Sequence, residues 1–110
     1  MEVVASARQV RISPRKVRLV LDTVRGKKVD EALTILGFLP TPAARTVAKV
    51  VKSAVANAEN NFQMVPAQLR IVKTFADKGQ TLKRYRAGAR GRVNPFHRRF
   101  SHIIVIVEED

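Results

Sequence analysis

The stretch HIIVIVE, residues 102–108, decides the fold of this chain. Its five inner residues, 103–107, are all Ile or Val. Such β-branched side chains pack well on the pleated surface of a sheet. An unbroken run of them bounded by polar residues predicts a strand at the centre of its sheet.

Two further strands are predicted before it. After Pro66 the chain alternates with a period of two, which is typical of a strand. The two alternating sets are Leu69, Ile71 and Phe75 against Arg70, Val72 and Thr74. The first dozen residues also alternate loosely and predict a strand, with Val4, Ala5, Ala7, Val10 and Ile12 as its apolar members.

A helix is predicted between Ser13 and Gly26. Serine can cap a helix and proline is tolerated at its first position, so Ser13-Pro14 marks the start. Glycine is typical of the position after a helix, so Gly26 marks the end. Apolar residues between them recur at i, i+3, i+4 and i+7, namely Val17, Val20, Leu21 and Val24.

Two more helices follow. Residues 29–36 form the first, with Asp30 and Glu31 at its start and Gly37 closing it before a turn at 37–40. Thr41-Pro42 repeats the capping signal, and the second helix runs to about Asn60. Its predicted apolar face consists of Val47, Val50, Val51, Ala54 and Ala58. The fold class is therefore α+β: three helices packed on a small three-stranded antiparallel sheet.

Residues 78–100 do not resemble a loop of a compact domain. They are too long for an ordinary connection, and no carboxylate occurs between Asp77 and Glu108. Glycines at 88 and 91 suggest a tip, so we predict a long extended β-hairpin with two arms of roughly 30 Å. Such a hairpin is marginal alone in water, and we expect phosphates to order it. Residues 1–110 then form a single RNA-binding domain that includes this hairpin.

Charge indicates the kind of partner. The 110 residues carry a net charge of +12, with 21 Lys and Arg against 9 Asp and Glu. A polyanion relieves such self-repulsion, and nucleic acid is the usual one. An anionic membrane is the rival, but no basic helix carries a large aromatic face and no lipidation motif is present. The chain has no cysteine, no signal peptide and no run long enough to span a bilayer.

The predicted RNA-binding residues form two groups. One surrounds the first helix, where a charged face that only contacts solvent is the alternative explanation. It comprises Arg8, Arg11, Arg15, Lys16, Arg18, Arg25, Lys27 and Lys28. The other lies on the hairpin and comprises Lys78, Lys83, Arg84, Arg86, Arg90, Arg92, His97, Arg98 and Arg99. A third basic row, Arg45, Lys49 and Lys52, is as compatible with a merely solvated face as with binding.

Four motifs give the chain a family resemblance. They are VRISPRKVRLVLDTVRGKKVDEAL at 10–33, SAVANAENN at 53–61, TLKRYRAGARGR at 81–92 and SHIIVIVEE at 101–109. In this order they resemble the ribosomal protein twenty-two family of the large subunit. That family has a small α+β domain and a long β-hairpin that runs through ribosomal RNA, with its tip in the nascent-chain tunnel.

The resemblance implies a structural constituent of the ribosome that binds rRNA and supports subunit assembly. It implies rRNA, neighbouring ribosomal proteins and the nascent chain as partners, and a cytoplasmic or organellar ribosome as location. The tunnel tip would comprise Gly88, Ala89, Arg90, Gly91 and Arg92. We expect no membrane association, no homo-oligomer, no cofactor, no metal and no catalytic residue.

An enzyme and a DNA-binding architectural protein are the two rival classes of protein. An enzyme is disfavoured, because the only histidines, His97 and His102, have no acidic neighbour in the sequence, and no phosphate loop, metal-spacing pattern or nucleophile motif occurs. A DNA-binding architectural protein is the closer rival, because a basic β-ribbon can enter a DNA groove. Charge alone does not separate DNA from RNA, and here only the family resemblance favours RNA.

Overall fold

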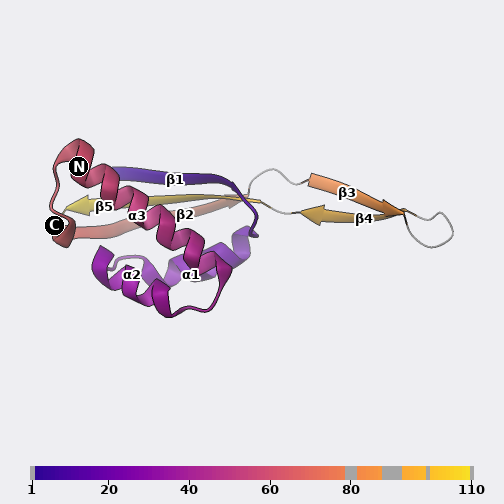
Figure 1. Cartoon of the computed structure of the whole chain (residues 1–110), viewed down its shortest axis with the longest axis horizontal. Helices are drawn as coiled ribbons and strands as arrows, with labels where there is room; N and C mark the ends of the chain where they lie inside the picture. Colours follow the sequence, from indigo (N-terminus) through magenta and orange to yellow (C-terminus); the bar gives the residue numbers. More distant parts are fainter. Residues whose placement is uncertain (1, 79–81, 88–92, 99, 110) are drawn as a thin grey trace.

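The computed structural model describes the backbone of residues 2–78, 82–87, 93–98 and 100–109, and the side chains of these residues apart from Gln9, 82–87 and 93–98. Within these ranges the elements follow one another along the chain (Figure 1). They are β1 (Glu2–Val10), α1 (Pro14–Val24), α2 (Val29–Phe38), α3 (Pro42–Phe62), the 3₁₀ turn η1 (Pro66–Gln68), β2 (Leu69–Lys78), β3 (Leu82–Ala87), β4 (Val93–Arg98) and β5 (Ser101–Glu109).

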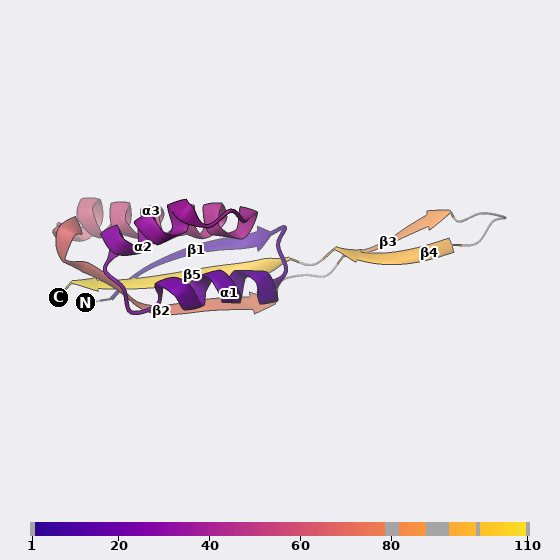
Figure 2. The same ribbon diagram turned by 90° about the horizontal axis from the view of Figure 1, so that it is seen from below.

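The part of the chain outside the hairpin, residues 2–78 and 100–109, is called the body here. It is built on a three-stranded antiparallel sheet in the order β1-β5-β2. Strand β5, which contains the Ile/Val run, lies at the centre, as predicted. Its side chains alternate between buried and half-buried, with Ile103, Val105 and Val107 fully covered. The three helices lie over that one face, with α3 along β1 and β5 and α1 along β2 (Figure 2). The predicted α+β class is confirmed.

The helices supply the other half of the core through the predicted stripes. All four apolar residues of the α1 stripe and all five of the α3 stripe are buried. The Thr41 hydroxyl caps α3 by accepting a hydrogen bond from the Ala44 amide at 3.3 Å. Ser13 holds the corresponding position before α1, but its side chain makes no capping hydrogen bond, so its predicted capping role is not realised.

Two helix ends differ from the prediction. Helix α2 does not stop at Gly37 but continues to Phe38, and the turn is shorter. Pro40 then prevents further helix, because the residue before a proline disfavours helical backbone. Helix α3 passes Asn60 and ends at Phe62, where Gln63 adopts a left-handed conformation with φ 53°. Gly26, at φ +80°, ends α1 as predicted.

Strand β2 does not keep its predicted alternation. Leu69 and Ile71 are buried, but a register shift against β5 between Ile71 and Lys73 reverses the phase of the strand. Thr74 is therefore buried, whereas Phe75 is 46% exposed on the uncovered face of the sheet. A β-bulge inserts one extra residue, and one residue is enough to exchange the two faces of a strand.

The hairpin projects from one end of the body, as predicted (Figure 1). Strands β3 and β4 pair from Leu82↔Arg98 to Ala87↔Val93, and they form a separate two-stranded sheet. Six paired residues at about 3.4 Å each give a ladder of roughly 20 Å. The chain measures 62 × 26 × 17 Å with a radius of gyration of 17.0 Å, whereas a compact chain of this length would have about 13 Å.

Candidate nucleic-acid interface

The base of the hairpin is joined to the start of α1. Ser101, the first residue of β5, pairs with Val10 of β1 and with Lys78 of β2, so all three strands meet at this row. The fully buried Ser101 hydroxyl donates a hydrogen bond to the carbonyl of Ile12. The segment between β1 and α1 is thereby held beside the point where the chain leaves the body.

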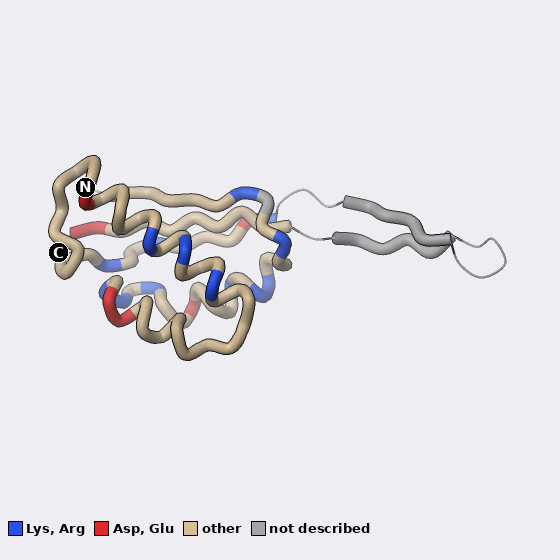
Figure 3. Tube along the Cα trace, in the orientation of Figure 1, with Lys and Arg blue, Asp and Glu red and all other residues tan. Residues whose placement is uncertain are grey.

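Exposed cations gather at this end of the body. They come from the end of β1, the linker after it, the first turn of α1 and the end of β2 (Figure 3). We name them the basal cluster: Arg8, Arg11, Arg15, Lys16 and Lys78. These residues lie up to seventy positions apart in the sequence, and only the meeting of three strands and one helix brings them together.

A hollow lies within the basal cluster, between the starts of α1 and α3. Arg11 and Lys16 supply its positive charge, while Leu19 and Pro42 supply apolar surface. Because the starts of α1 and α3 line it, the positive ends of two helix dipoles also lie at this place. Cations beside helix N-termini favour a bound anion such as a phosphate.

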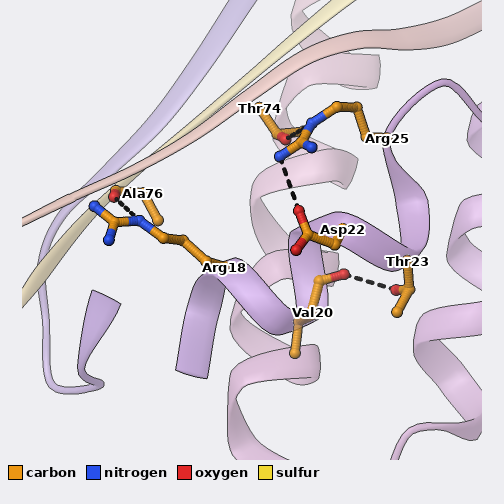
Figure 4. Close-up of polar contacts among 7 residues, drawn as sticks. All are labelled: Arg18, Val20, Asp22, Thr23, Arg25, Thr74 and Ala76. Carbon is orange, nitrogen blue, oxygen red and sulfur yellow. Dashed lines mark hydrogen bonds and ion pairs between the residues drawn. The ribbon is translucent and has the colours of Figure 1, made fainter. Parts of the chain in front are cut away.

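Two arginines of α1 are held against the edge strand β2 (Figure 4). Arg18 Nε donates to the Ala76 carbonyl at 3.0 Å, and Arg25 Nε donates to the Thr74 hydroxyl at 3.0 Å. Arg25 also forms an ion pair with Asp22 at 3.1 Å. Among the residues that the structure describes, Arg18 has no ion-pair partner, so its positive charge is not offset. Arg25 is partly neutralised by Asp22 and helps to pack α1 on β2.

The predicted patch around α1 is not a single site. Lys27 and Lys28 follow the far end of α1, which is 11 residues long and so spans about 16 Å. Lys27 forms an i,i+4 ion pair with Glu31 at 3.9 Å, and the Lys27 carbonyl accepts a hydrogen bond from the Ile71 amide. The structure thus separates these two lysines from the basal cluster and associates them with the junction of α1 and β2.

The hairpin predictions fall outside the described side chains. For Lys83, Arg84, Arg86, His97 and Arg98 only the backbone is described, within β3 and β4. The predicted contact Arg99 and the predicted tip residues lie wholly outside the described residues; the latter are Gly88, Ala89, Arg90, Gly91 and Arg92. Their roles remain predictions from the sequence.

Sequence reasoning missed one feature of the helical layer. Phe38, at the end of α2, is 84% exposed, and it lines a groove between α2 and α3 together with Arg45 and Lys52. The signal was present in the second half of α2, where Ile35, Leu36 and Phe38 lie close together in the sequence and cannot all face the core of the domain.

Within the described parts of the chain, no three His, Asp or Glu side chains lie close enough together to hold a metal ion. Of the helices that the structure describes, none is both long enough and apolar enough to cross a bilayer.

The fold and the basal cluster define a class, that of basic α+β proteins with a β-ribbon projecting from a cationic base. The family described as "Ribosomal protein L22p/L17e" matches residues 5–108. Two relatives named "Large ribosomal subunit protein uL22", from Dehalococcoides mccartyi strains BAV1 and CBDB1, are each 55% identical over 109 residues, covering 99% of this chain and 100% of the relative. The chain belongs to the L22p/L17e family of large-subunit ribosomal proteins, and the predicted resemblance is confirmed.

Proposed function

We propose that this chain is a structural, non-enzymatic constituent of the large ribosomal subunit that binds rRNA through the basal cluster, Arg18 and the hairpin. Family membership supports the subunit. The charge of the chain supports RNA as the ligand, because neutralisation of phosphates by Lys and Arg supplies most of the affinity of such proteins.

The observation that carries the proposal is the position of the basal cluster at the root of the hairpin. The hairpin sequence contains no carboxylate, and the body presents its own exposed cations where the hairpin begins. The basal cluster and the paired strands β3 and β4 therefore lie on one line along the 62 Å axis of the molecule (Figure 1). Such a line suits a strand of RNA that passes from the surface of the body along the ribbon.

The finer parts of the proposal rest on the family. In this family the tip of the hairpin reaches the nascent-polypeptide exit tunnel, and binding of rRNA supports subunit assembly. In this chain the corresponding tip is residues 88–92. The partners are then rRNA, neighbouring proteins of the subunit and the nascent chain, with no membrane and no second copy. The location is the ribosome of the cytoplasm, and an organellar ribosome is compatible with the same residues.

The test compares the intact chain with a variant in which two glycines replace residues 83–99. Binding to a large-subunit rRNA fragment is measured over a range of salt concentrations. We expect affinity to fall steeply with salt and the slope to flatten in the variant, because each lost phosphate contact lowers the slope by about 0.9. The residues of the described core all lie outside 83–99, so the variant should keep its thermal unfolding transition.

Duplex DNA of equal length at matched salt serves as the competitor. Preference of the intact chain for the rRNA fragment supports the proposal. Preference for duplex DNA favours an architectural DNA-binding role instead. An unchanged salt slope in the variant shows that the hairpin is not the main phosphate-binding element, and a large loss of thermal stability shows that it is part of the folded body.

A further inference from the structure

We propose that the groove between α2 and α3 is a docking site for an acidic, amphipathic segment of another protein of the large subunit. The groove is lined mainly by Leu33, Leu36, Phe38 and Ala48, with Arg45 and Lys52 on its α3 side. The inference rests on the chain's place in the large subunit and not on RNA binding, so it stands or falls separately from the proposed function.

Helix α2 has more apolar surface than the body covers. Val29, Ala32 and Leu36 are fully buried against α1 and α3, while Leu33 and Ile35 are only partly buried. A helix at the surface of a soluble domain normally presents a polar outer face. The exposed residues of its first turns are polar, namely Asp30, Glu31 and Thr34. Only the second half of α2, which ends at the exposed Phe38, therefore leaves apolar surface that is suited to burial in an assembly.

Phe38 is the most exposed large apolar residue of the described chain, with 84% of its surface in solvent. It is the last residue of α2, just before the link to α3, and forms one wall of the groove. Aromatic side chains at such positions bury 150–250 Å² on contact and are enriched at the centre of protein interfaces. Phe38 is therefore the expected anchor of the docked segment.

The positive charge of the groove favours an acidic partner. Arg45 and Lys52 line it, and none of its lining residues is acidic. Opposite charges across an interface set its partner and register. Because Arg45 and Lys52 are seven residues apart on α3, about 10.5 Å along the axis, acidic residues two turns apart on a docked helix would face both.

A protein segment fits the groove better than RNA does. Nucleic-acid interfaces are polar and use phosphate contacts, whereas the floor here consists of aliphatic side chains from α2 and α3. A hydrophobic centre with a cationic rim is the usual composition of a protein interface. The basal cluster near the hairpin already provides the polar surface that RNA prefers.

The test places a photoreactive benzoylphenylalanine at position 38 of the full chain, assembled into purified large subunits. Phe38 is exposed in the free chain, so the replacement should not disturb folding. We expect a cross-link to a protein segment with apolar residues flanked by Asp or Glu. The matched control carries the same group at Glu59, an exposed residue of α3 outside the groove. Cross-linking from position 38 to RNA alone, or to nothing in assembled subunits, overturns the proposal.

A second experiment reverses the charges that line the groove. Arg45→Glu with Lys52→Glu should lower the cross-link yield at least tenfold, while Lys49→Glu, on the same helix but outside the groove, should leave it unchanged. An equal effect of Lys49→Glu overturns the proposal, since it shows a general effect of charge. Affinity for the isolated rRNA fragment separates the two ideas. Because this proposal places no RNA in the groove, it expects Arg45→Glu alone and Lys49→Glu alone, which change the charge equally, to have the same effect on that affinity.

Discussion

The hydroxyl of Ser101 donates a hydrogen bond to the carbonyl of Ile12, and this contact joins the root of the hairpin to the start of α1. Ser101 is fully buried in the row where three strands meet. The contact explains why cations from β1, α1 and β2 lie together. It also couples the stability of the body to the geometry of the proposed RNA-binding surface.

Substitution Ser101→Ala should lower the free energy of unfolding by about 1 kcal/mol, because it leaves a carbonyl without its hydrogen-bond donor. Thermal or denaturant unfolding of the full chain measures this loss. Ser53→Ala, at an exposed position of α3, is the matched control and should change stability little. Equal stability of the Ser101 variant and the intact chain would show that the hydrogen bond is not formed in solution.

The glycines at 26 and 37 should respond in opposite directions to alanine. Gly26 has φ +80°, so Gly26→Ala introduces strain and should cost about 1 kcal/mol. Gly37 lies inside α2 with nothing within 4 Å of an added Cβ, so Gly37→Ala should stabilise by about 0.5 kcal/mol through helix propensity. Melting temperatures measure both. A destabilising Gly37→Ala would argue that α2 ends before residue 37.

The bulge in β2 predicts unequal costs for two apolar side chains of one strand. Ile71→Ala removes a fully buried side chain and should cost about 3 kcal/mol. Phe75→Ala removes a larger side chain that is 46% exposed, so it should cost about 1 kcal/mol or less. Denaturant unfolding compares the two variants. A cost for Phe75→Ala equal to that for Ile71→Ala would indicate that β2 keeps unbroken alternation.

The two anchored arginines of α1 should contribute unequally to RNA binding. Arg18→Gln should weaken binding to the rRNA fragment and lower the salt slope by about one phosphate contact. Arg25→Gln should lower it less, because Arg25 is paired with Asp22 and held by Thr74. The salt dependence of the dissociation constant measures both. A larger slope change for Arg25→Gln than for Arg18→Gln would reverse this assignment.

Much of the fold could be predicted from residues that are near one another in the chain. The apolar stripe of α3, the Ile/Val run of β5 and the acid-free hairpin segment all follow from local periodicity or composition. These features depend on the geometry of one element, in which i, i+4 or i+2 neighbours share a face. The predicted RNA-binding residues around the start of α1 also rest on composition, and their role stays a prediction.

The features of the fold that the sequence did not predict depend on contacts between segments that are distant in the chain. The bulge that exposes Phe75 depends on the register of β2 against β5, and the hydrogen bond from Ser101 to Ile12 spans 89 positions of sequence. The distance of Lys27 from the basal cluster likewise depends on where the two ends of α1 lie in the fold. Local sequence patterns were sufficient to predict the main helices and strands and the extended, cationic segment. Tertiary structure alone decided which faces meet, because register and the pairing of distant side chains depend on three-dimensional packing that no local pattern specifies.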